Sequence, residues 1–247
     1  MSLIEFKRIL FFCFLIALVA HVPFFQDDIG NTTNFKLFLI GYSLAIYAVQ
    51  IFTVYWLLGA HRAWLLSPFT GRALLHGLLG IIAVLGLTTG LLTFMSRSSP
   101  VTSPINLYFS YLPIFLINTL PGALLEEWIF RYLPLRFGLK KKRRDFAILT
   151  CGACLVLFTL YHIPAYLLFL NLPLTKLYGV FLHGIFFFCV YLFTKNLPFT
   201  TLVHAQTNNP LQLVESQFFW LYFYPSVLLI SCLWAFVNWK RKKSWNF

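Results

Sequence analysis

Residues 107–131 read LYFSYLPIFLINTLPGALLEEWIFR and join a long apolar run to a charged end. The run up to Leu125 approaches the length of about 20 residues that a helix needs to cross the hydrocarbon core of a bilayer. It then meets Glu126, Glu127 and Arg131, which are costly to place in a membrane unless they face a polar cavity or one another. The stretch therefore predicts a membrane helix, over residues 107–130, that carries functional charges.

The rest of the chain repeats the apolar pattern. Of 247 residues, 60% are hydrophobic and only 11% are charged, whereas a soluble domain has about 25% charged residues. We expect an all-α fold, a polytopic transmembrane helical bundle of about eight spans. The expected spans are residues 9–25, 35–58, 73–95, 107–130, 146–162, 177–193, 199–213 and 218–239.

Basic residues concentrate in every second loop and account for the net charge of +12. The densest runs are residues 140–144 (KKKRR) and 240–243 (KRKK), whereas Asp27, Asp28 and Glu215 fall in the other loops. The positive-inside rule then places both termini in the cytoplasm. The runs flank apolar spans, which favours a lipid bilayer with anionic headgroups as their partner and argues against nucleic acid. We expect an integral, multi-pass protein of the cell (inner) membrane of a prokaryote.

Polar side chains at four-residue spacing mark three of the spans. On a helix, residues i and i+4 lie on the same face, so Glu127 can pair with Arg131 while Glu126 points elsewhere. Phe158 and His162 share a face of the fifth span, and the seventh span carries a third pair of this kind. This third pair is His204 and Asn208.

Each of these polar residues also has a simpler interpretation. Glu127 and Arg131 form an ordinary i,i+4 ion pair in many helices, and His162 or His204 alone would be taken as a core histidine. The residues together are harder to explain in this way, because buried polar groups on three spans need one shared polar cavity. The charge pattern puts the ends of the fourth and fifth spans on opposite sides. Glu126 and His162 therefore meet only if one lies well inside its helix or the fifth helix ends short.

The chemistry of this set suits water attack on an amide. A carboxylate and a nearby imidazole can hold and deprotonate a water molecule. A second imidazole and an amide can donate hydrogen bonds to a developing oxyanion. The alternative is a non-enzymatic membrane protein, either a proton-coupled transporter, since intramembrane Glu and His also relay protons, or an immunity or scaffold protein.

The three motifs, in their order along the chain, resemble those of the CPBP intramembrane proteases. This family contains the type II CAAX prenyl endopeptidases and bacteriocin-processing, Abi-like relatives, and the resemblance covers residues 107–210. Its motifs are E-E-x-x-x-R, F-x-x-x-H and H-x-x-x-N or H-x-x-x-D. They correspond here to Glu126, Glu127 and Arg131, to Phe158 and His162, and to His204 and Asn208. Tyr132 departs from the pattern, because many relatives have Gly after the Arg.

The resemblance implies three parts of the chain and an activity. The parts are residues 1–105 with about three transmembrane helices, residues 106–215 as a CPBP-like catalytic helical core, and residues 216–247 as the last helix and a basic cytoplasmic tail. The expected activity is that of an intramembrane endopeptidase that cleaves a membrane-associated protein or peptide. Prenylated CAAX-type proteins and leader peptides are both candidate substrates.

The resemblance also implies a role for each motif residue. Glu126 is the expected general base, His162 shares its water, and Glu127 with Arg131 orients the site. His204 and Asn208 are the expected oxyanion hole. We expect no cofactor, although zinc held by Glu126, His162 and His204 is an alternative.

Overall fold

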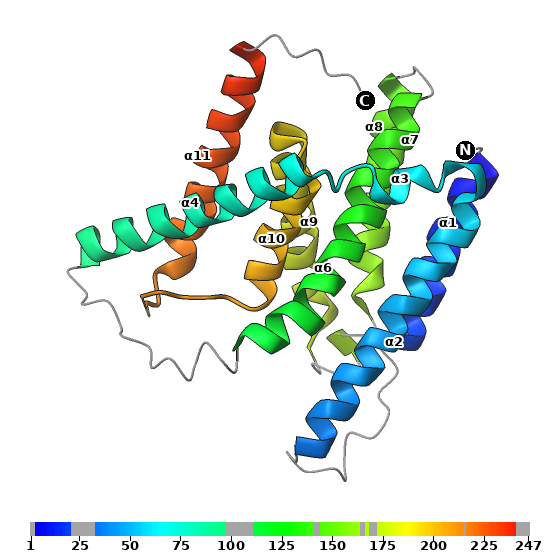
Figure 1. Cartoon of the computed structure of the whole chain (residues 1–247), viewed down its shortest axis with the longest axis horizontal. Coiled ribbons are helices and arrows are strands. Elements are labelled where there is room, and N and C mark those ends of the chain that lie inside the picture. Colours follow the sequence, from blue (N-terminus) through cyan, green and yellow to red (C-terminus); the bar gives the residue numbers. More distant parts are fainter. Residues whose placement is uncertain are drawn as a thin grey trace. The chain divides into compact units, whose positions relative to one another are not determined.

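The computed structural model describes residues 3–20, 33–96, 111–140, 144–163, 166–167, 172–214 and 216–240. Within these ranges the chain forms helices, turns and bends with no β-strand, which confirms the all-α prediction. The main helices are α1 (Leu3–Ala20), α2 (Thr33–Leu58), α4 (Gly71–Ser96), α6 (Leu120–Glu127), α7 (Leu133–Lys140), α8 (Arg144–Tyr161), α9 (Leu177–Thr194), α10 (Leu197–Asn208) and α11 (Phe219–Lys240) (Figure 1). The short helix α3 (Ala63–Leu66) precedes α4.

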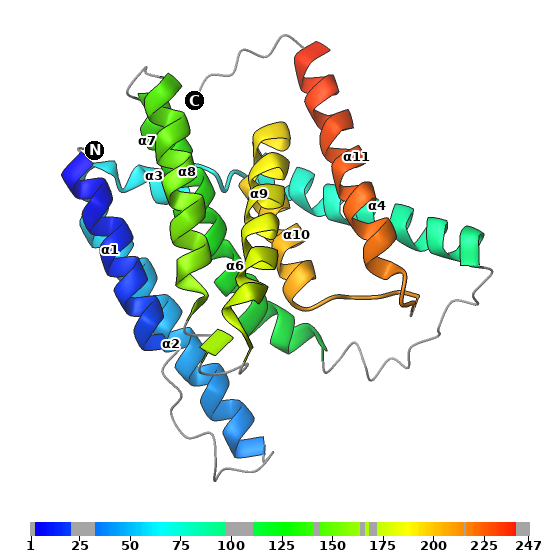
Figure 2. The same ribbon diagram turned by 180° about the vertical axis from the view of Figure 1, so that it is seen from behind.

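The chain divides into two compact units that interleave along the sequence. Unit 1 comprises Met1–Ser67 and Leu125–Phe186, and unit 2 comprises Pro68–Leu124 and Phe187–Phe247. In unit 1, α1 packs against α2 and α7 packs against α8 (Figure 2). In unit 2, α4 packs against both α10 and α11.

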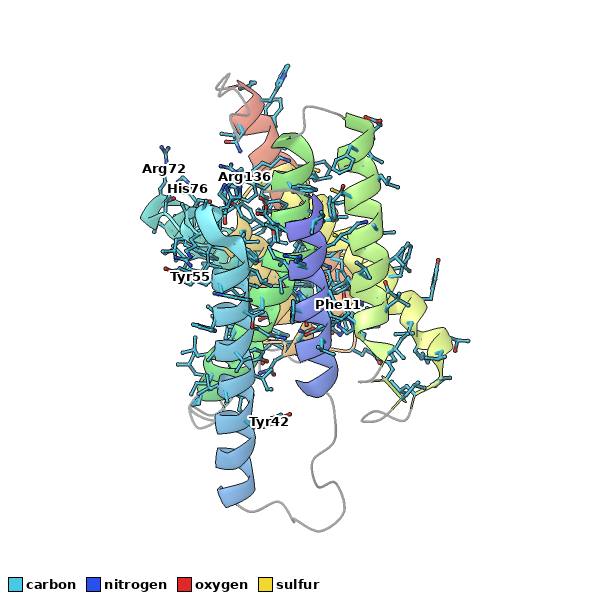
Figure 3. All side chains as sticks on the ribbon, turned by 90° about the vertical axis from the view of Figure 1, so that its right-hand side faces the viewer. Phe11, Tyr42, Tyr55, Arg72, His76 and Arg136 are labelled. Carbon is cyan, nitrogen blue, oxygen red and sulfur yellow. The ribbon has the colours of Figure 1, made fainter. Side chains whose placement is uncertain are left out.

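Apolar surface on these helices fits a lipid environment. Among the described residues, four helical stretches are long and apolar enough to cross a membrane. They are Leu44–His61, Ala63–Met95, Leu174–Thr194 and Phe219–Lys240. Large apolar side chains stand on the outside of both units, with Phe11 61% exposed and Ile82 56% exposed (Figure 3). The chain is therefore an integral membrane protein, while the count of eight spans and the cytoplasmic termini stay predictions.

The fourth predicted span was placed too short at its C-terminal end. Residues 111–140 are helical throughout, so the helix runs past the predicted end at Phe130 to Lys140. Two π-helical segments interrupt it, η2 (Phe115–Thr119) and η3 (Trp128–Tyr132). In η3, for example, the backbone N–H of Leu133 donates to the carbonyl of Trp128, five residues back.

Prolines account for the two π-helical segments of this helix. Pro121 and Pro134 each follow a π segment by two residues. Proline lacks an N–H and its ring clashes with the carbonyl four residues earlier, which a wide turn relieves without ending the helix. The predicted span ended at Phe130, beside the charged motif, whereas the helix continues through the charges and Pro134.

This longer helix removes the expected conflict between the depths of Glu126 and His162. Glu126 precedes the end of α7 at Lys140 by roughly 21 Å at 1.5 Å per residue. His162 follows the start of α8 at Arg144 by roughly 27 Å on the same measure. Glu126 therefore lies well inside its helix, which was the first of the two conditions for the residues to meet. Because α7 packs along α8, the two distances can be compared along the same pair of helices.

In unit 2, α10 is held by its first turn against α4. The helix begins after a tight turn in which Lys195 has a φ of 51°. Asn196 then caps it, because its side-chain oxygen accepts from the N–H of Phe199 at 2.8 Å, and its amide donates to the carbonyl of Ala73 on α4 at 2.9 Å.

Glycines on α4 make this approach possible. A Cβ at Gly77 would lie 2.9 Å from the backbone nitrogen of Phe199, and one at Gly80 would lie 2.7 Å from the Phe199 ring. The 12 residues of α10 are too few to cross a bilayer, and nine of them are buried. Other parts of the chain therefore shield this short segment.

Candidate active site

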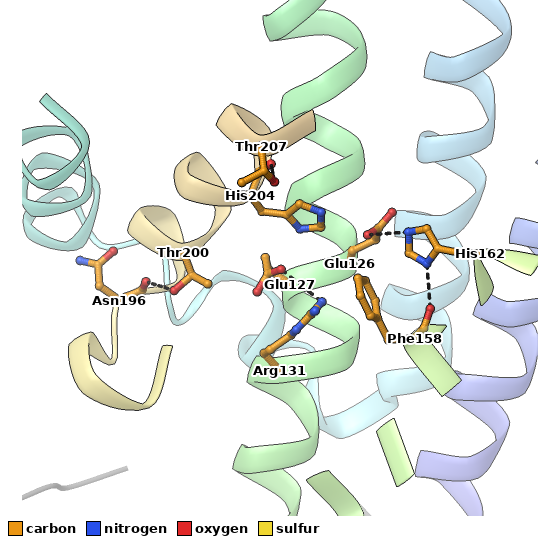
Figure 4. A network of polar contacts seen from close by, with 9 residues as sticks. All are labelled: Glu126, Glu127, Arg131, Phe158, His162, Asn196, Thr200, His204 and Thr207. Carbon is orange, nitrogen blue, oxygen red and sulfur yellow. Dashed lines mark hydrogen bonds and ion pairs between the residues drawn. The ribbon is translucent and has the colours of Figure 1, made fainter. Parts of the chain in front are cut away.

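The motif that ends α6 forms a buried ion pair. Nη1 of Arg131 lies 3.1 Å from Oε1 of Glu127, and the two side chains are 1% and 0% exposed. The guanidinium carbon lies 3.9 Å from the centre of the Phe158 ring on α8. A charge pair and a ring face thus hold Arg131 inside unit 1 (Figure 4), and Arg131 also interacts electrostatically with Glu126.

Glu126 turns away from this pair, toward α8. Its Oε2 lies 3.9 Å from Nε2 of His162, and the two side chains are 15% and 20% exposed (Figure 4). Glu126 had no basic residue at i+4, and its neighbour comes from the next motif along the chain. The structure therefore brings Glu126, Glu127, Arg131, Phe158 and His162 together in unit 1, while the single cavity predicted for all three motifs stays a prediction.

The orientation of the His162 ring decides which nitrogen faces Glu126. Nδ1 lies 2.8 Å from the carbonyl oxygen of Phe158. A carbonyl only accepts, so Nδ1 carries a proton, and when the ring is neutral the lone pair of Nε2 faces the carboxylate. The Phe158 ring, 4.7 Å from the imidazole between centroids, supports it from the side.

Two hydrogen-bond acceptors therefore face each other across 3.9 Å. This exceeds the limit of about 3.2 Å for a direct hydrogen bond. One water molecule fits the spacing if it donates one hydrogen to each acceptor, and its oxygen lone pairs then point away from both. Such an arrangement is suited to activating a nucleophilic water.

Helix α2 contributes residues that sequence reasoning missed. The phenol of Tyr47 interacts electrostatically with Glu126. Gln50, three residues on and so on the same face of α2, is only 3% exposed. A lone tyrosine and a lone glutamine in an apolar span give no motif, so only the packing of α2 identifies them.

The third motif lies in unit 2, on α10. His204 is 3% exposed, and its ring stacks on that of Phe187 with centroids 4.3 Å apart. The hydroxyl of Thr207 donates to the His204 carbonyl at 2.7 Å. Asn208 ends the helix with an exposed side chain. The i,i+4 placement on one helix is thus present, with His204 buried and Asn208 at the surface of its unit.

The loop after α10 is fixed within the same unit. The hydroxyl of Tyr111 donates to the carbonyl of Asn209 at 2.7 Å, and the amide of Gln206 donates to the carbonyl of Leu211 at 2.9 Å. These two bonds hold the end of α10, and Asn196 holds its start. His204 therefore sits on a helix that is anchored at both ends.

The donor set does not by itself define a metal centre. In the described part of the chain, no three His, Cys, Asp or Glu side chains group so that they could hold a metal ion. Glu126 and His162 supply two possible ligands in unit 1. The zinc set with His204 stays an untested alternative.

Comparisons with known proteins bear on the same stretch of chain. Residues 108–209 match the model of the family described as type II CAAX prenyl endopeptidase Rce1-like. The matched range contains all three motifs. A search of the curated proteins and a search of the solved structures gave no significant match. Residues 108–209 are therefore similar in sequence to the type II CAAX prenyl endopeptidase Rce1-like family, whose members are hydrolases.

Proposed function

We propose that the protein is an intramembrane endopeptidase that uses Glu126 as the general base of a water-mediated hydrolysis. The observation that carries the proposal is the 3.9 Å spacing between Oε2 of Glu126 and Nε2 of His162, with Nδ1 of His162 bonded to a carbonyl. A carboxylate and an oriented imidazole in a membrane protein can also relay protons, and the similarity to a hydrolase family favours hydrolysis over proton-coupled transport.

The reaction then proceeds in two steps. Glu126 takes a proton from the water while the water oxygen attacks the carbonyl carbon of the scissile peptide bond. The protonated Glu126 next gives its proton to the leaving nitrogen as the carbon–nitrogen bond breaks. The products are a carboxylic acid and an amine, the acid then passes its remaining proton to the amine to leave a carboxylate and an ammonium group, and Glu126 is restored as a base.

The remaining motif residues support this reaction. Arg131 pairs with Glu127 and so stabilises the helix that carries Glu126. Its positive charge also interacts with the Glu126 carboxylate. His204 and Asn208 are assigned as donors to the oxyanion of the tetrahedral intermediate. The reaction needs no metal in this scheme. Stoichiometric zinc in the purified protein that is lost in His204→Ala would overturn that point.

The substrate is proposed to be a membrane-associated protein or peptide, with prenylated CAAX-type chains as the first class to test. New protein termini are compared between cells that carry the wild type and cells that carry Glu126→Ala. The proposal expects termini that depend on Glu126 in membrane-associated proteins. Identical termini, together with pH-driven solute flux in reconstituted vesicles, would instead favour a transporter.

A further inference from the structure

A groove between α4 and α11 lies in unit 2 and contains none of the motif residues. Its volume is about 530 Å³. Pockets of about 300–1,000 Å³ hold small ligands. The lining is mostly apolar and comes from the first half of α4 and the second half of α11. The lining residues are Arg72, His76, Leu79, Gly80, Ile230, Leu233, Trp234, Val237 and Asn238.

The polar lining residues lie at one end of both helices. Arg72 and His76 occupy the first two turns of α4, one helical turn apart on the same face (Figure 3). Asn238 lies in the last turn of α11, next to the terminal Lys240. The polarity of the groove therefore changes along its length. Hydrogen-bond donors and positive charge lie at one end, and apolar side chains line the rest.

Trp234 forms the floor at the point where the helices approach. Its ring lies 6.1 Å from that of His76 in an edge-to-face arrangement and 5.5 Å from that of Phe199. A Cβ at Gly80 would come within 3.1 Å of the same ring. The groove is thus built by close packing of α4 against α11, and the indole is well placed to report on any occupant.

We propose that this groove binds one anionic glycerophospholipid, with its phosphate at Arg72, His76 and Asn238 and an acyl chain along Leu79, Leu233 and Val237. Both helices are candidate membrane spans, so the apolar part of the groove faces acyl chains. Guanidinium and imidazole N–H groups donate charge-assisted bonds to phosphate oxygens, and the groove has no acidic lining residue to oppose them. Charge complementarity therefore selects an anionic lipid over a zwitterionic one.

The site also bears on how α10 is held. Ala73, whose carbonyl accepts from Asn196, and Gly77, which makes room for the first turn of α10, lie between the groove residues of α4. A lipid bound at Arg72 and His76 braces this part of α4 from another side. Occupancy is therefore expected to stabilise the contact between α4 and α10 within unit 2.

The test uses quenching of Trp234 fluorescence by lipids with brominated acyl chains. The full chain is reconstituted in phosphatidylcholine vesicles that contain a small fraction of brominated phosphatidylglycerol or, in parallel, of brominated phosphatidylcholine. The signal of Trp234 is taken as the difference between the wild type and Trp234→Phe. The proposal expects that phosphatidylglycerol quenches this signal at a roughly ten-fold lower mole fraction than phosphatidylcholine.

Variants locate the headgroup. Arg72→Gln is expected to abolish the ten-fold preference, whereas Arg62→Gln, a matched loss of charge at a residue outside the groove, is expected to keep it. Equal quenching of the wild type by the two brominated lipids would overturn the proposal, and this comparison needs no variant of Arg72. An unchanged preference in Arg72→Gln would also overturn it.

Inorganic phosphate separates a lipid site from a simple anion site. The proposal expects phosphatidylglycerol quenching to persist when phosphate is added at constant ionic strength, because the acyl chain contributes to binding. Complete reversal by phosphate would show an anion site that does not need a lipid, which contradicts the proposal. The measurement requires no proteolysis, so its outcome is independent of the proposed function.

Discussion

The guanidinium of Arg131 lies 3.9 Å from the centre of the Phe158 ring. The same Phe158 ring lies 4.7 Å from the His162 ring between centroids, in an edge-to-face arrangement. Phe158 thus connects the buried ion pair on the fourth predicted span to the imidazole at the end of the fifth. Its own carbonyl also accepts from Nδ1 of His162. One residue therefore contacts both the Arg131 guanidinium and the His162 imidazole, which explains why a phenylalanine stands four residues before the histidine.

Replacing Phe158 by leucine tests this connection. The change keeps an apolar side chain but removes the ring face, and a buried cation–ring contact contributes about 2 kcal/mol. We expect a lower thermal midpoint in detergent and a roughly ten-fold loss of kcat as His162 loses its lateral support. Phe193→Leu, at a ring that is 39% exposed on α9, is the control and should leave both values near wild type.

The Glu127–Arg131 pair separates structural from catalytic roles. Removal of one partner leaves a buried, uncompensated charge, so Glu127→Met or Arg131→Met should each destabilise the protein by about 3–5 kcal/mol. The double variant with Met at both positions removes both charges and should regain most of the stability.

Activity is then compared at matched stability. If the pair orients the site, the folded double variant should still cleave at least ten times more slowly than the wild type. Wild-type cleavage by the double variant would reduce the pair to an ordinary ion pair, which was the simpler interpretation of this spacing. Thermal midpoints and cleavage rates of the three variants supply the comparison.

Two glycines on α4 give opposite expectations for the same substitution. At Gly77 a Cβ would lie 2.9 Å from a backbone nitrogen of α10, so Gly77→Ala should cost about 1–3 kcal/mol of stability. At Gly86 a Cβ would meet nothing within 4 Å, so Gly86→Ala should be neutral or add up to about 1 kcal/mol from helix propensity. Thermal unfolding of the two variants checks both signs. Equal effects would contradict the close packing of α4 against α10.

The sequence predicted the helical class and the pairing of residues within each of the first two motifs, because both depend on local rules. Apolar runs of bilayer length identify helices, and i,i+4 spacing put Glu127 on the face of Arg131 and Phe158 on the face of His162. The predicted spans 177–193 and 199–213 also left a gap where the turn between α9 and α10 lies.

What the sequence did not predict depends on contacts between distant segments and on backbone adjustments. The helix passes through Glu126 to Lys140 because π turns accommodate Pro121 and Pro134, whereas local rules treat proline and charge as an end. The electrostatic interaction between Tyr47 and Glu126 depends on how α2 packs, which the sequence does not give. His76 was one isolated histidine in the sequence, and its place in a groove with Arg72 required the approach of α11.

The role of Glu126 is tested most directly by Glu126→Gln in purified protein reconstituted in vesicles with a prenylated CAAX-type peptide. The amide keeps the shape of the side chain but cannot accept the proton of water, so cleavage should fall by about 100-fold or more while the thermal midpoint stays near wild type. Asp145→Asn, at an exposed carboxylate in the first turn of α8, should retain activity. Wild-type cleavage by Glu126→Gln would contradict the assignment of Glu126 as the base.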